Sequence, residues 1–129
     1  MTSQPAPEGL FESFRRAEML ISRSRPLDAL QALIPVLRSQ PDDASVQLLA
    51  GRAYLDSAQL GRAEAAFVRV LELDPADHYA RFALGKALQR QGRLPEAQAQ
   101  LRMAAAMDPR PEYQEALGEV RARMAVDAE

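Results

Sequence analysis

The sequence predicts an all-α protein built from repeated pairs of helices. Three observations support this fold class: a 34-residue period along the chain, small residues and prolines at fixed places within each copy, and apolar residues at helical spacing between them. The segment "LGRAEAAFVRVLELDP", residues 60–75, is followed one period later by "LPEAQAQLRMAAAMDP", residues 94–109. Such a period is typical of solenoids, in which each unit packs only on its neighbours.

Composition narrows the class of protein further. The 129 residues are 47% hydrophobic and carry a formal charge of -2, which fits one compact unit. The start "MTSQPAPEGL" has no basic segment followed by an apolar run, and no long apolar stretch occurs, so we expect neither secretion nor a membrane and place the protein in the cytoplasm. The absence of cysteine excludes disulfides and thiolate chemistry, and no block of like charges suggests nucleic acid.

The copies can be aligned position by position. A shift of 34 residues places Gly51 on Gly85 and Pro75 on Pro109, and the opposite shift reveals a weaker first copy. We therefore expect repeats at residues 10–43, 44–77 and 78–111. The corresponding positions of the three copies are Ala17, Gly51 and Gly85; Ala29, Ala63 and Ala97; Leu33, Phe67 and Leu101; and Pro41, Pro75 and Pro109.

Each copy contains signals for two helices. Asp43 and Asp77 are expected to cap the first helices of the second and third copies, and the second helix of the second copy should end near Leu73. Pro95 suits the first turn of a helix, where its missing N–H costs little. In the first copy, Pro35 lies within a helical pattern and removes one hydrogen bond, which predicts a kink or an early end near Ile34.

The repeated small residues have a packing reason. A glycine or alanine on each helix of a pair lets the two backbones approach closely, and the large apolar residue fills the space beside that contact. A single pair cannot bury its apolar face, so a similar neighbour must cover it. Residues 112–129 are expected to form a solvating cap and tail, and residues 1–9 a flexible leader.

Residues 10–111 resemble three tetratricopeptide repeats. The family's pattern of small, aromatic, alanine, aromatic and proline residues is met at Gly51, Tyr54, Ala63, Phe67 and Pro75, and in softened form in the other two copies. The tryptophan that often stands near the start of each repeat is replaced by Ser13, Gln47 and Arg81. The resemblance implies a right-handed α-solenoid of three helix-turn-helix pairs, whose concave surface is formed by the first helix of each pair.

On that surface the resemblance implies a groove for a segment of another protein. Aromatic anchors beside basic residues are typical of peptide-binding surfaces, and we expect a partner with apolar and acidic groups. The expected groove residues are Phe11, Phe14, Glu18, Leu48, Arg52, Asp56, Tyr79, Phe82, Lys86 and Arg90. Related co-chaperones hold a terminal carboxylate with lysine, asparagine and arginine. The matching positions here are Phe14, Glu18, Leu49, Tyr79 and Ala83, so no such clamp is expected.

Other functions are less well supported by the sequence. His78 is the sole histidine and follows a helix cap, where we expect an exposed structural role. Neither a nucleophile paired with a base nor a phosphate-binding turn is evident, so we expect no enzyme, no cofactor and no metal. The leading interpretation is an adaptor or chaperone-like module, with a bacterial three-repeat secretion chaperone as a narrower version. The alternatives are a structural or self-associating subunit, in which the apolar row of Phe14, Leu48 and Phe82 is the oligomer contact, and an enzyme with an unrecognised carboxylate site. A further interpretation of this row is ordinary packing between helices or cover by the C-terminal helix.

Overall fold

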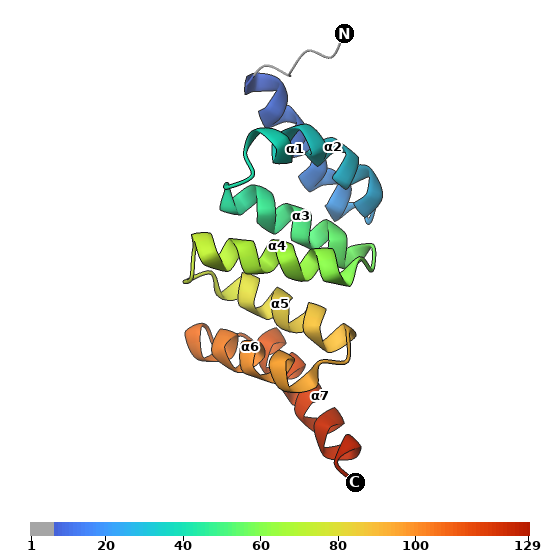
Figure 1. Ribbon diagram of the computed structural model, residues 1–129, viewed down its shortest axis with the longest axis vertical. Helices are drawn as coiled ribbons and strands as arrows, with labels where there is room; N and C mark the ends of the chain where they lie inside the picture. The colour runs from blue at the N-terminus through green and yellow to red at the C-terminus, as the bar shows by residue number, and fades with distance from the viewer. Residues whose placement is uncertain (1–6) are drawn as a thin grey trace.

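A computed structural model describes residues 7–129, which form seven α-helices and no strand (Figure 1). Successive helices are stacked as three pairs followed by a single last helix, and each pair packs on the next. This confirms the predicted all-α solenoid. The helices are α1 (Pro7–Ser22), α2 (Pro26–Ser39), α3 (Ala44–Asp56), α4 (Leu60–Leu73), α5 (His78–Arg90), α6 (Leu94–Met107) and α7 (Pro111–Asp127).

The expected caps start the first helices of the second and third pairs. The Asp43 carboxylate accepts a hydrogen bond from the Val46 amide at 3.2 Å, and Asp77 accepts one from the Ala80 amide at 2.9 Å. Each carboxylate satisfies a backbone donor that the first helical turn leaves without a partner. Helix α4 ends at Leu73, as predicted, and Pro95 lies in the first turn of α6.

The turn inside each pair has the same geometry three times. Ser24, Ala58 and Gly92, which are 34 residues apart, have φ angles of 60°, 60° and 78°. In each turn the following residue donates its amide to a carbonyl five residues earlier, at 2.8 to 3.0 Å. This is the hydrogen bond of a Schellman helix end, which calls for a left-handed residue. Only Gly92 is a glycine, so the first two turns hold L-residues in a strained conformation.

Two expectations about the first repeat require correction. Helix α1 begins at Pro7, so the predicted leader of residues 1–9 is too long; its first six residues lie outside the described part of the chain. Helix α2 continues through Pro35 to Ser39, so an early end at Ile34 is wrong. Leu33 and Val36 are buried on either side of the proline, and tertiary packing of that apolar face offsets the missing hydrogen bond.

The small residues lie where the two helices of a pair cross. An added Cβ at Gly51 would lie 2.5 Å from the Phe67 ring, and one at Gly85 would lie 2.7 Å from the Leu101 side chain. Both distances are shorter than real carbon contacts, so a side chain at either position would force the facing Phe67 or Leu101 to move. Ala17 is fully buried at the matching crossing of the first pair, where an alanine is accommodated.

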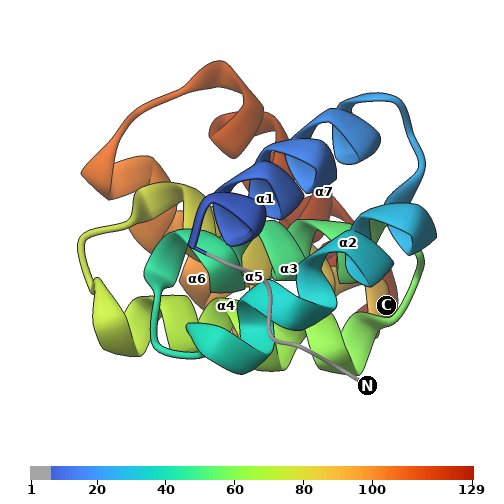
Figure 2. The same ribbon diagram turned by 90° about the horizontal axis from the view of Figure 1, so that it is seen from above.

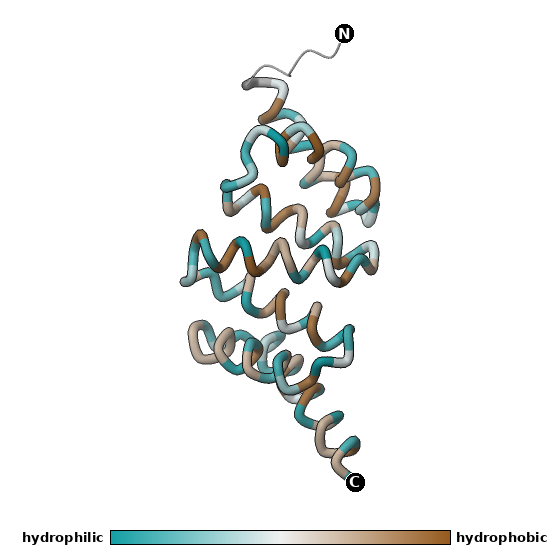
Figure 3. The backbone as a smooth tube through the Cα atoms, viewed as in Figure 1, coloured by the Kyte–Doolittle hydropathy of each residue, from teal (hydrophilic) through white to brown (hydrophobic). Residues whose placement is uncertain are grey.

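The buried side chains form a core along the stack. One cluster joins α1, α2 and α3, a second joins α4 to α7, and Tyr54 packs against both. Figure 3 shows hydrophobic and hydrophilic segments alternating along the helices, as expected when each buries one face. Residues Tyr113, Ala116, Leu117 and Val120 of α7 are buried, consistent with the predicted capping helix.

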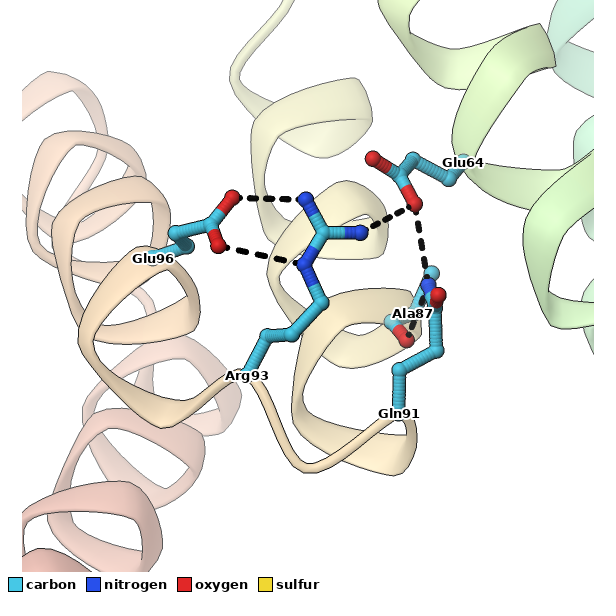
Figure 4. Close-up of polar contacts among 5 residues, drawn as sticks. All are labelled: Glu64, Ala87, Gln91, Arg93 and Glu96. Atoms are coloured by element: carbon cyan, nitrogen blue, oxygen red, sulfur yellow. Dashed lines mark hydrogen bonds and ion pairs between the residues drawn. The ribbon is translucent and has the colours of Figure 1, made fainter.

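Polar contacts join the second pair to the third (Figure 4). Glu64 of α4 accepts hydrogen bonds from Arg93 at 2.7 Å and from Gln91 at 3.1 Å. Arg93 also binds Glu96 through two nitrogens, at 3.1 and 2.6 Å, and these bonds lower the pKa of Glu96. The contacts connect the turn before α6 to the preceding repeat and help to fix how the pairs are stacked.

The residues in place of the repeat tryptophan also join neighbouring pairs. The Gln47 amide donates to the Pro41 carbonyl at 2.8 Å, and the Arg81 guanidinium donates to the Pro75 carbonyl at 3.2 Å. The donors Gln47 and Arg81 are one 34-residue period apart, and so are the acceptors Pro41 and Pro75. Polar side chains therefore replace an aromatic one at this position by bonding to the backbone of the preceding repeat.

Candidate interaction surface

The first helices of the pairs lie on the inner side of the stack. Helix α1 approaches α3, α3 approaches α5, and α5 approaches α7, whereas within the described chain α2 does not approach α4, nor α4 approach α6. Because the first helices are closer together, the stack curves around them. In the view along the stack, α1 and α4 lie on opposite sides (Figure 2). We call the surface formed by α1, α3 and α5 the inner face.

The predicted groove residues differ in exposure on this face. Five are exposed: Phe11, Glu18, Arg52, Asp56 and Arg90. The other five are half-buried: Phe14, Leu48, Tyr79, Phe82 and Lys86. The exposed set is mostly charged and the half-buried set mostly apolar, which gives the inner face an apolar floor with charged positions above it.

At the third repeat, the helix α7 already covers part of this floor. The Phe82 ring stacks on Tyr113 with 4.6 Å between centroids and 24° between planes, and Tyr113 is fully buried. The Tyr113 hydroxyl lies 2.8 Å from Nδ1 of His78, whose Nε2 lies 3.3 Å from Asp108. His78 thus has a structural role, as expected, but it is half-buried and positions the cap rather than facing solvent.

Tyr79 lies beside this aromatic stack and beside a basic residue. Its ring centroid is 6.1 Å from that of Phe82, and burial raises the pKa of its hydroxyl. The positive charge of Arg52 lowers the Tyr79 pKa in opposition, while the negative charges of Asp56, Asp77 and Glu112 raise it. Lys86 lies with its Nζ 5.8 Å from the Phe82 centroid. Aromatic rings and basic groups are therefore adjacent on the inner face.

Two basic groups on this surface have no acidic partner among residues 9–129, whose side chains the structure describes. Neither Arg52 nor Lys86 makes a hydrogen bond or an ion pair with a described residue. By contrast, Arg69 and Arg93, on or next to the second helices, each bind two acidic side chains. Arg90 donates to the Leu55 carbonyl at 2.9 Å, which ties α5 to the end of α3. The charges of Arg52 and Lys86 are available to a partner, whereas Arg90 is engaged in the fold.

A pocket of about 450 Å³ opens at the first repeat. It lies between the start of α1, the end of α2 and the start of α3, and Phe11 and Phe14 form part of its wall. The remaining lining residues are Leu10, Val36, Ser39, Gln40, Asp43, Ser45 and Val46. Phe11 is 65% exposed at its mouth. Sequence reasoning found the two phenylalanines but not the pocket, because part of its lining comes from the second helix of the pair.

Other kinds of site find little support in the described residues. Nowhere in residues 9–129 do three or more histidine, aspartate or glutamate side chains group closely enough to hold a metal ion. None of the seven described helices is long and apolar enough to cross a membrane.

Stacked helical pairs with an inner face of this kind define a helical-repeat protein. Two sequence profiles described as tetratricopeptide repeat match the chain, one over residues 14–78 and the other over residues 54–120. The chain belongs to the tetratricopeptide repeat family. No curated protein sequence matches it significantly.

Solved structures are similar in fold at low sequence identity. The first tetratricopeptide domain of Spaghetti (RPAP3), bound to the HSP90 peptide SRMEEVD, has a TM-score of 0.85 and 14% identity, covering 96% of this chain and 99% of that one. The second domain of human RPAP3, in complex with the HSP70 peptide SGPTIEEVD, has a TM-score of 0.81 and 16% identity, covering 88% and 96%. The protein MamA has a TM-score of 0.85 and 16% identity, covering 92% and 70%.

Proposed function

We propose that the chain is a protein-interaction module that binds a segment of a partner protein on its inner face. The observation that carries this proposal is the pair of basic groups on the inner face, Arg52 on α3 and Lys86 over the half-buried Phe82 ring, neither of which has an acidic partner among residues 9–129. A segment with acidic and apolar groups would complement such a surface. Complementary charge fixes orientation and register and speeds association more than it adds affinity.

The proposed partner differs from the peptides of the two RPAP3 domains. Both of those domains were solved with chaperone peptides ending in EEVD. Here the five positions that match the family's carboxylate clamp carry Phe14, Glu18, Leu49, Tyr79 and Ala83, and Leu49 and Ala83 are buried. Glu18 would repel a terminal carboxylate, and no basic side chain stands at these positions. We therefore propose an internal acidic segment rather than a chaperone tail.

The test is selection from a displayed library of random peptides, followed by affinity measurements on those selected. We expect enrichment of peptides that combine acidic and apolar residues. The double variant Arg52→Glu, Lys86→Glu should bind them at least tenfold more weakly and associate more slowly. A control with the same change in charge, Arg38→Glu, Arg102→Glu, alters exposed residues of second helices and should bind normally. Equal weakening in both double variants would contradict binding at the inner face.

Self-association is the second candidate. Leu27 and Ile34 are one heptad apart on α2 and are 64% and 44% exposed, which gives the first pair an apolar stripe. Light scattering of the protein at increasing concentration tests this candidate. A stable dimer that Leu27→Glu dissociates would favour a structural subunit over a peptide-binding module.

A further inference from the structure

Two positions, 31 residues apart, recur wherever one first helix meets the next. At the junction of α5 and α7, Tyr113 stacks on Phe82, and the two residues are 31 positions apart. At the junction of α3 and α5, Tyr79 and Leu48 have the same separation and pack against the same core cluster. At the junction of α1 and α3, the corresponding residues are Phe14 and Ser45. An aromatic ring therefore fills two of these junctions, and a serine stands at the first.

The first junction is open where the other two hold a ring. The pocket of about 450 Å³ lies at this place, with Phe14 in one wall and Ser45 in the other. A cavity of about 150 Å³ is enough to bind benzene in an engineered protein, so the available space exceeds what a single ring needs. Phe14 offers such a ring the stacking surface that Phe82 offers to Tyr113.

We propose that this pocket binds the side chain of a phenylalanine in the partner segment, an inference that rests on the proposed function. The choice of phenylalanine over tyrosine comes from the polar groups around Tyr113. Its hydroxyl bonds to His78, and the residue two periods before His78 is Leu10, which lines the pocket. A tyrosine bound in the same way would have no counterpart of the His78 hydrogen bond at this position, whereas a phenylalanine ring needs none.

The positive charge of Arg52, on the same helix as Ser45, predicts an acidic residue in the partner segment. Arg52 follows Ser45 by two helical turns on α3, a distance of about 10.5 Å along the axis. An extended segment covers that distance in about three residues. The partner should therefore carry an aspartate or glutamate about three positions from the phenylalanine. Residues 1–6 of the chain itself, MTSQPA, contain neither an aromatic nor an acidic residue, so they do not match this chemistry.

The pocket can be tested without a partner by using toluene, the side chain of phenylalanine, as the probe. Titration into the wild-type protein, followed by amide chemical shifts in NMR spectra, should give saturable changes at Phe14, Ser45 and Val46. The variant Ser45→Tyr should fill the pocket, weaken toluene binding at least tenfold and raise the melting temperature. The control Ala122→Tyr adds the same ring at an exposed site of α7 and should leave toluene binding unchanged.

Two results would overturn the proposal. One is the absence of saturable shifts at the pocket in the wild-type protein, which decides the matter even if Ser45→Tyr does not fold. The other is a set of selected peptides that bind through Arg52 and Lys86 but contain no aromatic residue; this would leave the proposed function intact and reject the pocket. A third result would separate the two proposals in the other direction. If Ser45→Tyr abolishes toluene binding but no selected peptide depends on Arg52 and Lys86, the pocket is real and the proposed function is rejected.

Discussion

At the scale of single residues, glycines within the helices of this chain have two different surroundings. Gly51 and Gly85 lie against Phe67 and Leu101 at helix crossings, where an added Cβ would force the facing side chain to move. Gly118 lies in α7, and a Cβ there would meet no atom within 4 Å. The same substitution should therefore have opposite effects at the two kinds of position.

Replacing Gly51 by alanine should destabilise the protein by about 1 to 3 kcal/mol, because the added methyl group forces the Phe67 ring to move. Gly118→Ala is the matched control and should stabilise by about 0.5 to 1 kcal/mol, because alanine favours the helix. Urea denaturation monitored by circular dichroism measures both. A neutral or stabilising Gly51→Ala would mean that the helices of the second pair do not cross so closely.

At Ala58, in a left-handed turn, a change from alanine to glycine should stabilise the protein. An L-residue in this conformation costs about 1 to 2 kcal/mol, and glycine removes that cost while losing more entropy on folding. Ala58→Gly should therefore stabilise by about 0.5 to 1 kcal/mol, and Gly92→Ala in the matching turn should destabilise. If Ala58→Gly lowers the unfolding midpoint, the turn does not have the φ angle of 60° described here.

The ion pair of Glu96 with Arg93 predicts a dependence on pH. The pair lowers the pKa of Glu96 in the folded state, so its contribution is present above the unfolded pKa of about 4.3 and is lost as the pH falls through the folded value. Glu96→Gln should lower the urea midpoint at about pH 7 and have little effect at about pH 2. The exposed Glu115→Gln is the control. An equal loss for Glu96→Gln at both pH values would exclude an electrostatic cause.

At the scale of elements, α7 both completes the core and closes one end of the inner face. Its buried residues cover the last repeat, and Tyr113 stacks on Phe82. Its solvent-facing side carries mainly polar and charged residues, as required of the last helix in a solenoid. Phe82, one of the aromatic groove residues expected from the sequence, is for this reason partly engaged within the fold.

Removing one contact of α7 should show its contribution. Leu117 is 4% exposed, and Leu117→Ala should destabilise by about 2 to 5 kcal/mol, as expected when a buried leucine is truncated. Val126 is 67% exposed in the same helix, and Val126→Ala should change stability by less than about 0.5 kcal/mol. Thermal unfolding of both variants is the measurement. Similar melting temperatures for Leu117→Ala and the wild type would show that α7 is not part of the cooperative core.

At the scale of the whole molecule, periodicity made the solenoid predictable. The 34-residue register placed the caps Asp43 and Asp77 and the close crossings at Gly51 and Gly85, because each depends on local sequence or on its counterpart one repeat away. The course of α2 through Pro35 was not predictable, since burial on both sides of the proline overrides a local penalty.

The inner face was predictable only as a set of positions. The family resemblance indicated which residues lie on the first helices, but exposure depends on what packs against them. Tyr113 stacks on Phe82 from a helix outside the repeats, and Val36 reaches the floor of the first pocket from α2. Such contacts join different helices, so the exposure of each position could not be predicted from the repeat pattern alone.

The central claim is that the inner face binds a partner segment, and the most direct measurement is a map of amide chemical shifts on titration with a peptide selected from the displayed library. The account predicts changes that follow α1, α3 and α5, strongest near Ser45, Arg52 and Lys86, with α4 and α6 little affected. Changes concentrated on α4 and α6, with the inner face unperturbed, would contradict it.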